Sequence, residues 1–161
     1  MAHTIFRSDS CSYTHDGALL RTGIAPADID NGMPVVVGAL ASTGTYAGER
    51  EVFTTSLASA TSDDVWVVTT PELDYTTFAK GDFYNKDGAI VRLSKLVKYD
   101  IFSITAGGTG NLSDTPTTTK KYLTVKAGGG WTVGSSATGA FAQLLSIENV
   151  GGETFYVYEV L

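Results

Sequence analysis

Closely spaced turn signals constrain the fold of this chain more than any other feature of its sequence. Clusters of glycine, asparagine and aspartate, which tolerate positive backbone φ angles, separate nearly all of the runs of apolar and β-branched residues. These clusters lie at residues 30–32, 43–44, 85–88, 107–108, 128–130 and 151–152. Because long helices do not fit between breaks at this spacing, the sequence predicts many short strands and little helix.

The segments between the turns have the composition of β-strands. Threonine is the commonest residue, and with valine, tyrosine, phenylalanine and tryptophan it supplies side chains that suit a pleated, half-buried surface. The expected strands are 18–24, 34–40, 50–57, 64–70, 90–97, 100–105, 121–126, 140–149 and 154–160. We therefore predict an all-β fold, a compact antiparallel barrel or sandwich with irregular loops, whose strand order the sequence does not determine.

The C-terminal end is the clearest single unit. The segments LLSIENV and TFYVYEV flank Gly151-Gly152-Glu153 and alternate apolar with polar side chains, which predicts a β-hairpin. By the two-residue period of a strand, Phe155, Val157 and Glu159 share one face, and Tyr156, Tyr158 and Val160 share the other. Both faces of this strand therefore carry large side chains. We expect one to pack on the core and the other on a second sheet, a loop or a partner chain.

Length, charge and cysteine content limit the partners. A chain of 161 residues favours one domain, and its apolar runs, such as 34–37, are far shorter than a membrane-spanning helix. Eleven basic residues against 17 acidic ones give a net charge of −6, which is unlike a nucleic-acid-binding surface. The single Cys11 excludes a disulfide within the chain.

Trp66 and Trp131, in or beside apolar strands, are expected in the core.

The familiar signatures of catalysis and metal binding are incomplete. The run Asp28–Gly32 resembles the start of a calcium loop, but its twelfth position is Ala39 rather than a bidentate glutamate. His3 and His15 lack further ligands at zinc spacing. We therefore expect no metal, no cofactor and no catalytic residues.

A small hydrolase is the alternative that this expectation leaves open. Its candidate groups are His15 and Asp16 beside Ser10, Cys11 and Ser12. Two carboxylate pairs are further candidates, Glu72 with Asp74 and Glu49 with Glu51. Neighbours in sequence do not by themselves form a catalytic geometry, and the surroundings of both carboxylate pairs are polar. Ordinary solvated side chains are the simpler interpretation.

The order of the segments along the chain resembles a family of phage structural proteins. The segments TIFRSD, YTHDGALLRTG and ADIDNGMPVVVG are followed by GEREVF, TTPELDY, GDFYNKDG and LVKYDIFSIT, and the chain ends in LSIENVGGETFYVYEV. In this order they resemble the head decoration, or cement, proteins of tailed bacteriophages. The resemblance spans most of the chain.

The resemblance implies a non-enzymatic protein of the virion. Such a protein is made in the host cytoplasm, binds the major capsid protein on the outer surface of the assembled head, and stabilises the shell against internal DNA pressure. Family analogy implies a homo-oligomer, a trimer, and repeated weak contacts then add up through multivalency. The alternative is a head-fibre or tail component that binds host-surface glycans, for which exposed Trp and Tyr platforms are expected.

Two groups of side chains are the predicted capsid contacts. An N-terminal arm, residues 1–16, would precede the β domain of residues 17–161 and would carry Ile5, Phe6 and Tyr13. It would order on binding by adding a strand to a neighbour's open edge. The alternative is that this segment is the first strand of the domain itself. The second group consists of four aromatic residues, Tyr75, Phe78, Phe83 and Tyr84. Core packing is expected for at least half of them.

Overall fold

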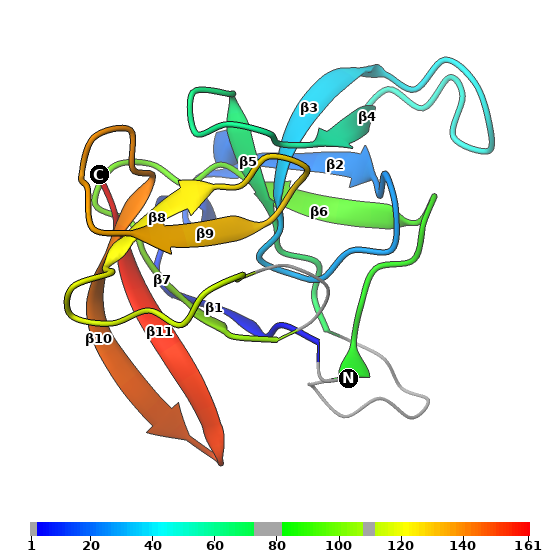
Figure 1. Cartoon of the computed structure of the whole chain (residues 1–161). Coiled ribbons are helices and arrows are strands. Elements are labelled where there is room, and N and C mark those ends of the chain that lie inside the picture. The colour runs from blue at the N-terminus through cyan, green and yellow to red at the C-terminus, as the bar shows by residue number, and fades with distance from the viewer. Residues whose placement is uncertain (1–2, 73–81, 108–111) are drawn as a thin grey trace.

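A computed structural model, which describes residues 3–72, 82–107 and 112–161, gives an all-β protein (Figure 1). The described residues form eleven strands and two 3-10 turns, η1 and η2, which lie between the first two strands. The strands in chain order are β1 (Phe6–Ser10), β2 (Leu20–Ile24), β3 (Pro34–Leu40), β4 (Val52–Leu57), β5 (Val65–Val68), β6 (Ile90–Ser94), β7 (Ile101–Thr105), β8 (Tyr122–Val125), β9 (Trp131–Gly134), β10 (Ala142–Val150) and β11 (Glu153–Val160). The 3-10 turns are η1 (Ser12–Thr14) and η2 (Gly17–Leu19).

The strands form a barrel and a sheet. The barrel is closed in the order β2-β4-β3-β5-β6, and the six-stranded sheet has the order β1-β7-β11-β10-β8-β9. All pairings are antiparallel except β2 with β4, which is parallel and joins only Thr22 to Val52 and Gly23 to Phe53. The predicted all-β class is confirmed, with this one parallel pair as a correction to a wholly antiparallel fold.

Strand β5 shows why the barrel and the sheet are one packed body. Its four residues, VWVV, are all buried, as expected of a strand that is covered on both faces. Trp66 and Val68 point into the barrel core, whereas Val65 and Val67 join the second core beneath the six-stranded sheet. Trp131 lies in that second core, so both tryptophans are buried as predicted.

The predicted arm is part of the sheet in this structure. Residues 6–10 form β1, an edge strand that pairs antiparallel with β7 from Phe6–Ile104 to Ser10–Ile101. The buried carboxylate of Asp100 then fixes η1, because it accepts hydrogen bonds from the Ser12 amide at 2.9 Å and the Ser12 hydroxyl at 2.7 Å. It also accepts from the amide of Val97 at 2.9 Å. The N-terminal segment is thus bonded to the turn between β6 and β7.

Candidate functional site: an exposed hairpin and its sheet edge

The predicted contact residues of the N-terminal segment lie mostly inside the protein. Ile5 and Tyr13 are 7% and 6% exposed, and Tyr13 belongs to the core beneath the six-stranded sheet. Phe6 is partly buried and stacks on Phe102, with ring centroids 5.7 Å apart. A contact through Ile5 or Tyr13 would therefore require the segment to leave the sheet. Of these three residues, Phe6 alone keeps a partly exposed side chain.

The second predicted group is only partly within the described residues. Tyr75 and Phe78 lie outside them. Phe83 and Tyr84 are half-buried and line a shallow hollow beside Ile90. The Tyr84 ring stacks on His3 at 4.9 Å, and the Nδ1 atom of His3 lies 2.6 Å from the Asp30 carboxylate. Tyr84 thus contacts the N-terminal segment at His3.

The surface that sequence reasoning missed is on the C-terminal hairpin. Strands β10 and β11 pair along their whole length, and their far end projects from the body at the lower left of Figure 1. Strand β8 pairs with β10 only at Ala142 and Gln143. Among the described strands, none pairs with the outer edge of residues 145–150. The hairpin therefore presents an open sheet edge, which can accept another strand.

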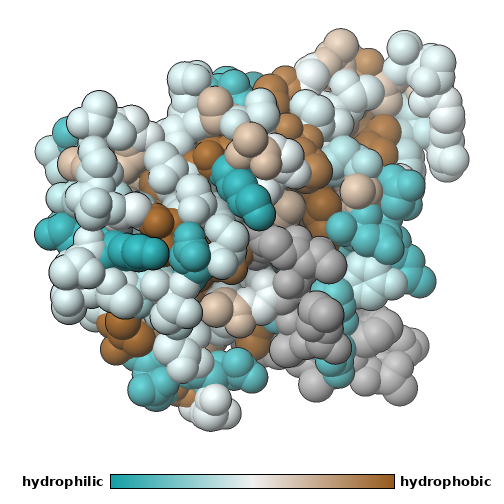
Figure 2. All heavy atoms as spheres, in the orientation of Figure 1, coloured by the Kyte–Doolittle hydropathy of each residue, from teal (hydrophilic) through white to brown (hydrophobic). Residues whose placement is uncertain are grey.

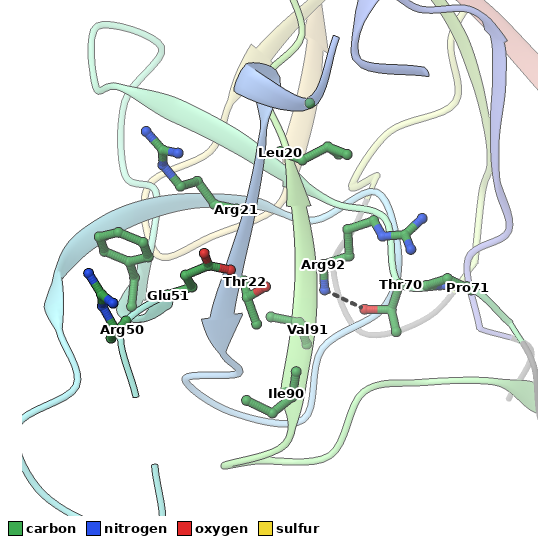
Figure 3. A pocket seen from close by; sticks show the side chains of 12 residues that line it. Leu20, Arg21, Thr22, Arg50, Glu51, Thr70, Pro71, Ile90, Val91 and Arg92 are labelled. Carbon is green, nitrogen blue, oxygen red and sulfur yellow. Dashed lines mark hydrogen bonds between the residues drawn. The ribbon is translucent and has the colours of Figure 1, made fainter. Parts of the chain in front are cut away.

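Apolar side chains accompany this open edge. Residues 145–150 are all exposed, and Leu145, Ile147 and Val150 are exposed to 50%, 48% and 49%. Figure 2 shows hydrophobic residues over the projecting hairpin beside hydrophilic ones. Exposed apolar groups gathered on a projecting element are typical of a contact surface. We call residues 145–150 the hairpin edge. The alternation in LLSIENV predicts its strand, but the short reach of β8 is not visible in the sequence.

One charged side chain connects β1 with the hairpin. Arg7 lies over the ring of Phe155, with its guanidinium carbon 4.4 Å from the ring centroid. It forms ion pairs at 3.1 Å with Asp9 and with Glu148 on β10. These carboxylates outweigh the effect of its partial burial and raise the pKa of Arg7 above its ordinary value. Arg7 thus links β1 to the hairpin through the Phe155 ring and through Glu148, which is itself a residue of the hairpin edge.

The structure gathers several of the groups considered for catalysis around one polar hollow. Ser10, Cys11, Ser12 and His15 line it together with Asp100. The Ser12 hydroxyl, however, donates to Asp100, and the Cys11 thiol donates to the Ile101 carbonyl oxygen at 3.2 Å. Burial raises the pKa of Cys11 to about 12, which keeps the thiol protonated and unreactive. Among the described residues, neither side chain is bonded to His15.

The acidic candidates are engaged or dispersed. Asp30 is buried and accepts from His3 and from the amide of Thr4 at 3.0 Å. Glu49 and Glu51 are exposed, Glu72 is half-buried, and Asp74 lies outside the described residues. Within residues 3–72, 82–107 and 112–161, no three or more His, Cys, Asp and Glu side chains are grouped to hold a metal ion.

Comparisons with known proteins add no family to this geometry. No family model matches the chain, and no curated protein or solved structure matches it significantly. The class defined by the fold is thus an all-β protein built from a barrel and a six-stranded sheet. The part of the chain that the structure describes contains no helix of the length and apolar character needed to cross a membrane.

Proposed function

We propose that this protein is a capsid decoration protein. In this role it binds the major capsid protein on the outer surface of an assembled phage head and stabilises the shell, acting as a homo-oligomer, a trimer by family analogy. The order of the resembling segments along the chain supports the proposal. So does the all-β body, because a decoration protein needs a rigid body and an adhesive surface rather than a reactive site.

The observation that carries the proposal is the hairpin edge. An open strand edge offers main-chain hydrogen bonds to an extended segment, and the exposed Leu145 and Ile147 add apolar contact. One such contact is small compared with a stable interface. On a capsid the same contact repeats over many sites, and an oligomer that engages several of them at once gains avidity. The hairpin edge thus fits a weak attachment that is multiplied by the lattice.

The proposal is tested by binding to heads. Purified protein is mixed with expanded heads assembled without it, and co-sedimentation and the temperature of head disruption are measured. We expect saturable binding and a higher disruption temperature. Ile147→Asp places a charge on the hairpin edge and should abolish most of the binding, because a buried unpaired carboxylate opposes the contact.

A matched control is available on the barrel. Leu40, the last residue of β3, is 47% exposed, close to the 48% of Ile147. Strand β3 lies at the opposite end of the molecule from the projecting end of the hairpin in Figure 1. Leu40→Asp should bind heads like the unaltered protein. Failure of the unaltered protein to bind heads would refute the proposed function. Binding that Ile147→Asp leaves unchanged would instead refute the role of the hairpin edge.

A second candidate function is attachment of the virion to host-surface glycans. Tyr99 favours it, because this side chain is 68% exposed and has a left-handed backbone conformation, with φ 74°. Strained, exposed residues of this kind often mark functional sites. Tyr99 borders the polar hollow that contains Asp9, Ser12 and His15, an arrangement that suits stacking of a sugar ring with hydroxyl contacts at its rim. Glycan-array binding that Tyr99→Ala removes, without binding to heads, would favour this function.

A further inference from the structure

The four adjoining strands β1, β7, β11 and β10 of the six-stranded sheet are acidic. They contain one basic residue, Arg7, and four acidic ones: Asp9, Glu148, Glu153 and Glu159. One positive against four negative charges gives these strands a net charge of −3. The whole chain has a net charge of −6, so half of it is carried by the part of the sheet that includes the hairpin edge.

The pairing of β10 with β11 separates charged from apolar side chains at the hairpin edge. Glu148 is paired with Phe155, and paired residues share a face of the sheet. Its neighbour Ile147 is paired with Tyr156 and points to the opposite face. The contact of Arg7 with both Phe155 and Glu148 agrees with this register. We call the side with Glu148 the acidic face and the side with Ile147 the apolar face.

Further carboxylates lie on the acidic face. Because side chains alternate along β11, Glu153 and Glu159 share the face of Phe155. The ion pairs among the described residues include neither of them. Arg7, the single basic side chain of these strands, is shared between Asp9 and Glu148. The acidic face therefore keeps an excess of negative charge beside the open edge.

A strand added to the hairpin edge would meet both faces at once. Its residue beside Ile147 would lie on the apolar face, and the next residue along it would lie beside Glu148 on the acidic face. Opposite charges on neighbouring strands attract, and like charges placed side by side destabilise the pairing. We propose that the hairpin edge binds an extended segment of a partner in which apolar residues alternate with Lys or Arg. This inference rests on the attachment role proposed for the hairpin edge and adds the chemistry of the bound segment.

The same charges disfavour a second copy of this chain as the occupant. Pairing between two hairpin edges would bring two copies of Glu148 and Glu153 onto adjoining strands, with the matching base Arg7 already engaged in each copy. Repulsion between like charges opposes that arrangement. A basic segment, by contrast, compensates the excess charge and covers Ile147, which is 48% exposed.

The test compares two dye-labelled eight-residue peptides, one of alternating Val and Lys and one of alternating Val and Glu. Fluorescence anisotropy measures their binding to the full chain. The basic peptide should bind about tenfold more tightly, and added salt should reduce this preference. Glu148→Lys should reverse the preference. Glu153→Lys should reduce it by a smaller factor and breaks no ion pair of the described residues, so the test does not depend on the Arg7 contact.

Matched controls separate the hairpin edge from the net charge and from general stickiness. Glu49→Lys makes the same change in net charge at an exposed residue outside these strands and should leave the preference almost unchanged. Ile147→Ser should weaken binding of the basic peptide about fivefold, whereas Leu40→Ser, at a residue of similar exposure, should not.

Three results would overturn the inference. They are no binding of either peptide at low salt, equal binding of both, and a shift by Glu49→Lys as large as that by Glu148→Lys. If the protein binds heads through Ile147 and yet shows no preference between the peptides, the inference fails and the proposed function stands. A preference for the basic peptide without binding to heads would instead refute the proposed function.

Discussion

Trp131 on β9 donates its indole N–H to the carbonyl oxygen of Gly32, 2.7 Å away in the protein interior. Gly32 ends the turn that leads into β3, and its own amide donates to the Val68 carbonyl oxygen at 2.7 Å. The turn needs glycine here because its φ is 84°, in the left-handed region. Two hydrogen bonds thus connect one turn of the barrel to the six-stranded sheet on one side and to β5 on the other.

Replacing this indole should cost much of the stability of the fold. Trp131→Phe leaves the buried Gly32 carbonyl without its partner and leaves unfilled space, which together lower the free energy of unfolding by about 2–4 kcal/mol. Urea denaturation followed by circular dichroism measures the loss. Trp66→Phe is the control, because the Trp66 indole donates to Asp64, whose side chain is 72% exposed. An equal loss in both variants would contradict the special role of the Trp131 hydrogen bond.

Gly23 should not tolerate a side chain. A Cβ atom at this position would lie 2.7 Å from Leu93 Cδ1 and 2.7 Å from Thr55 Cγ2, and Leu93 is fully buried. We expect Gly23→Ala to lower the free energy of unfolding by about 1–3 kcal/mol through overpacking of the barrel.

Gly134 provides the comparison for this substitution. It lies on β9 with no atom within 4 Å of an added Cβ, so Gly134→Ala should be neutral or slightly stabilising. Thermal unfolding of both variants measures the contrast. Similar melting temperatures for the two would mean that the barrel adjusts around position 23.

Local alternation was enough to predict most strands, and long-range pairing explains what it did not predict. Each of the nine expected segments overlaps a strand, and β3 has the predicted bounds of 34–40. The parallel pairing of β2 with β4 depends on contacts between Thr22 and Val52, which no turn signal indicates. The sequence around Ile5 looks like an isolated arm because its partners are about 100 residues away, as in the hydrogen bond from the Ile5 amide to the Thr105 hydroxyl.

The candidate contact surface also has a part that the local sequence predicts and a part that depends on long-range pairing. The sequence indicates the hairpin and its apolar residues, but exposure of Ile147 depends on where β8 ends relative to β10. That exposure produces no local pattern in the sequence. Tyr13, by contrast, looks like an exposed anchor in sequence and is buried because η1 folds back onto the core.

The Tyr158 hydroxyl should be dispensable. The side chain is fully buried and stacks on Phe102 at 5.8 Å, but its Oη atom has no hydrogen-bond partner in the described structure. Burial raises the pKa of Tyr158, so the group stays neutral. Tyr158→Phe removes an unsatisfied polar atom and should leave stability unchanged or raise it by about 1 kcal/mol. Denaturant unfolding checks this result.

Tyr13 gives the opposite expectation for the same change. Its hydroxyl is hydrogen-bonded to the Ser8 hydroxyl. Tyr13→Phe should therefore lower the free energy of unfolding by about 1 kcal/mol. A larger loss from Tyr158→Phe than from Tyr13→Phe would indicate that the Tyr158 hydroxyl has a partner, such as a buried water.

The buried thiol of Cys11 should make the protein sensitive to alkali. Its pKa is raised by burial from an ordinary value of 9.0 to about 12. Above pH 9 the unfolded chain loses this proton while the folded protein retains it, so the free energy of unfolding falls as pH rises towards 12. The slope from this one group approaches about 1.4 kcal/mol per pH unit. Cys11→Ala removes the titration and keeps every tyrosine, so its stability should fall less between pH 8 and pH 11. If the free energy of unfolding falls with pH in the same way for both proteins, the Cys11 thiol contributes nothing to the pH dependence. That result would mean that the thiol ionises in the folded protein, without unfolding.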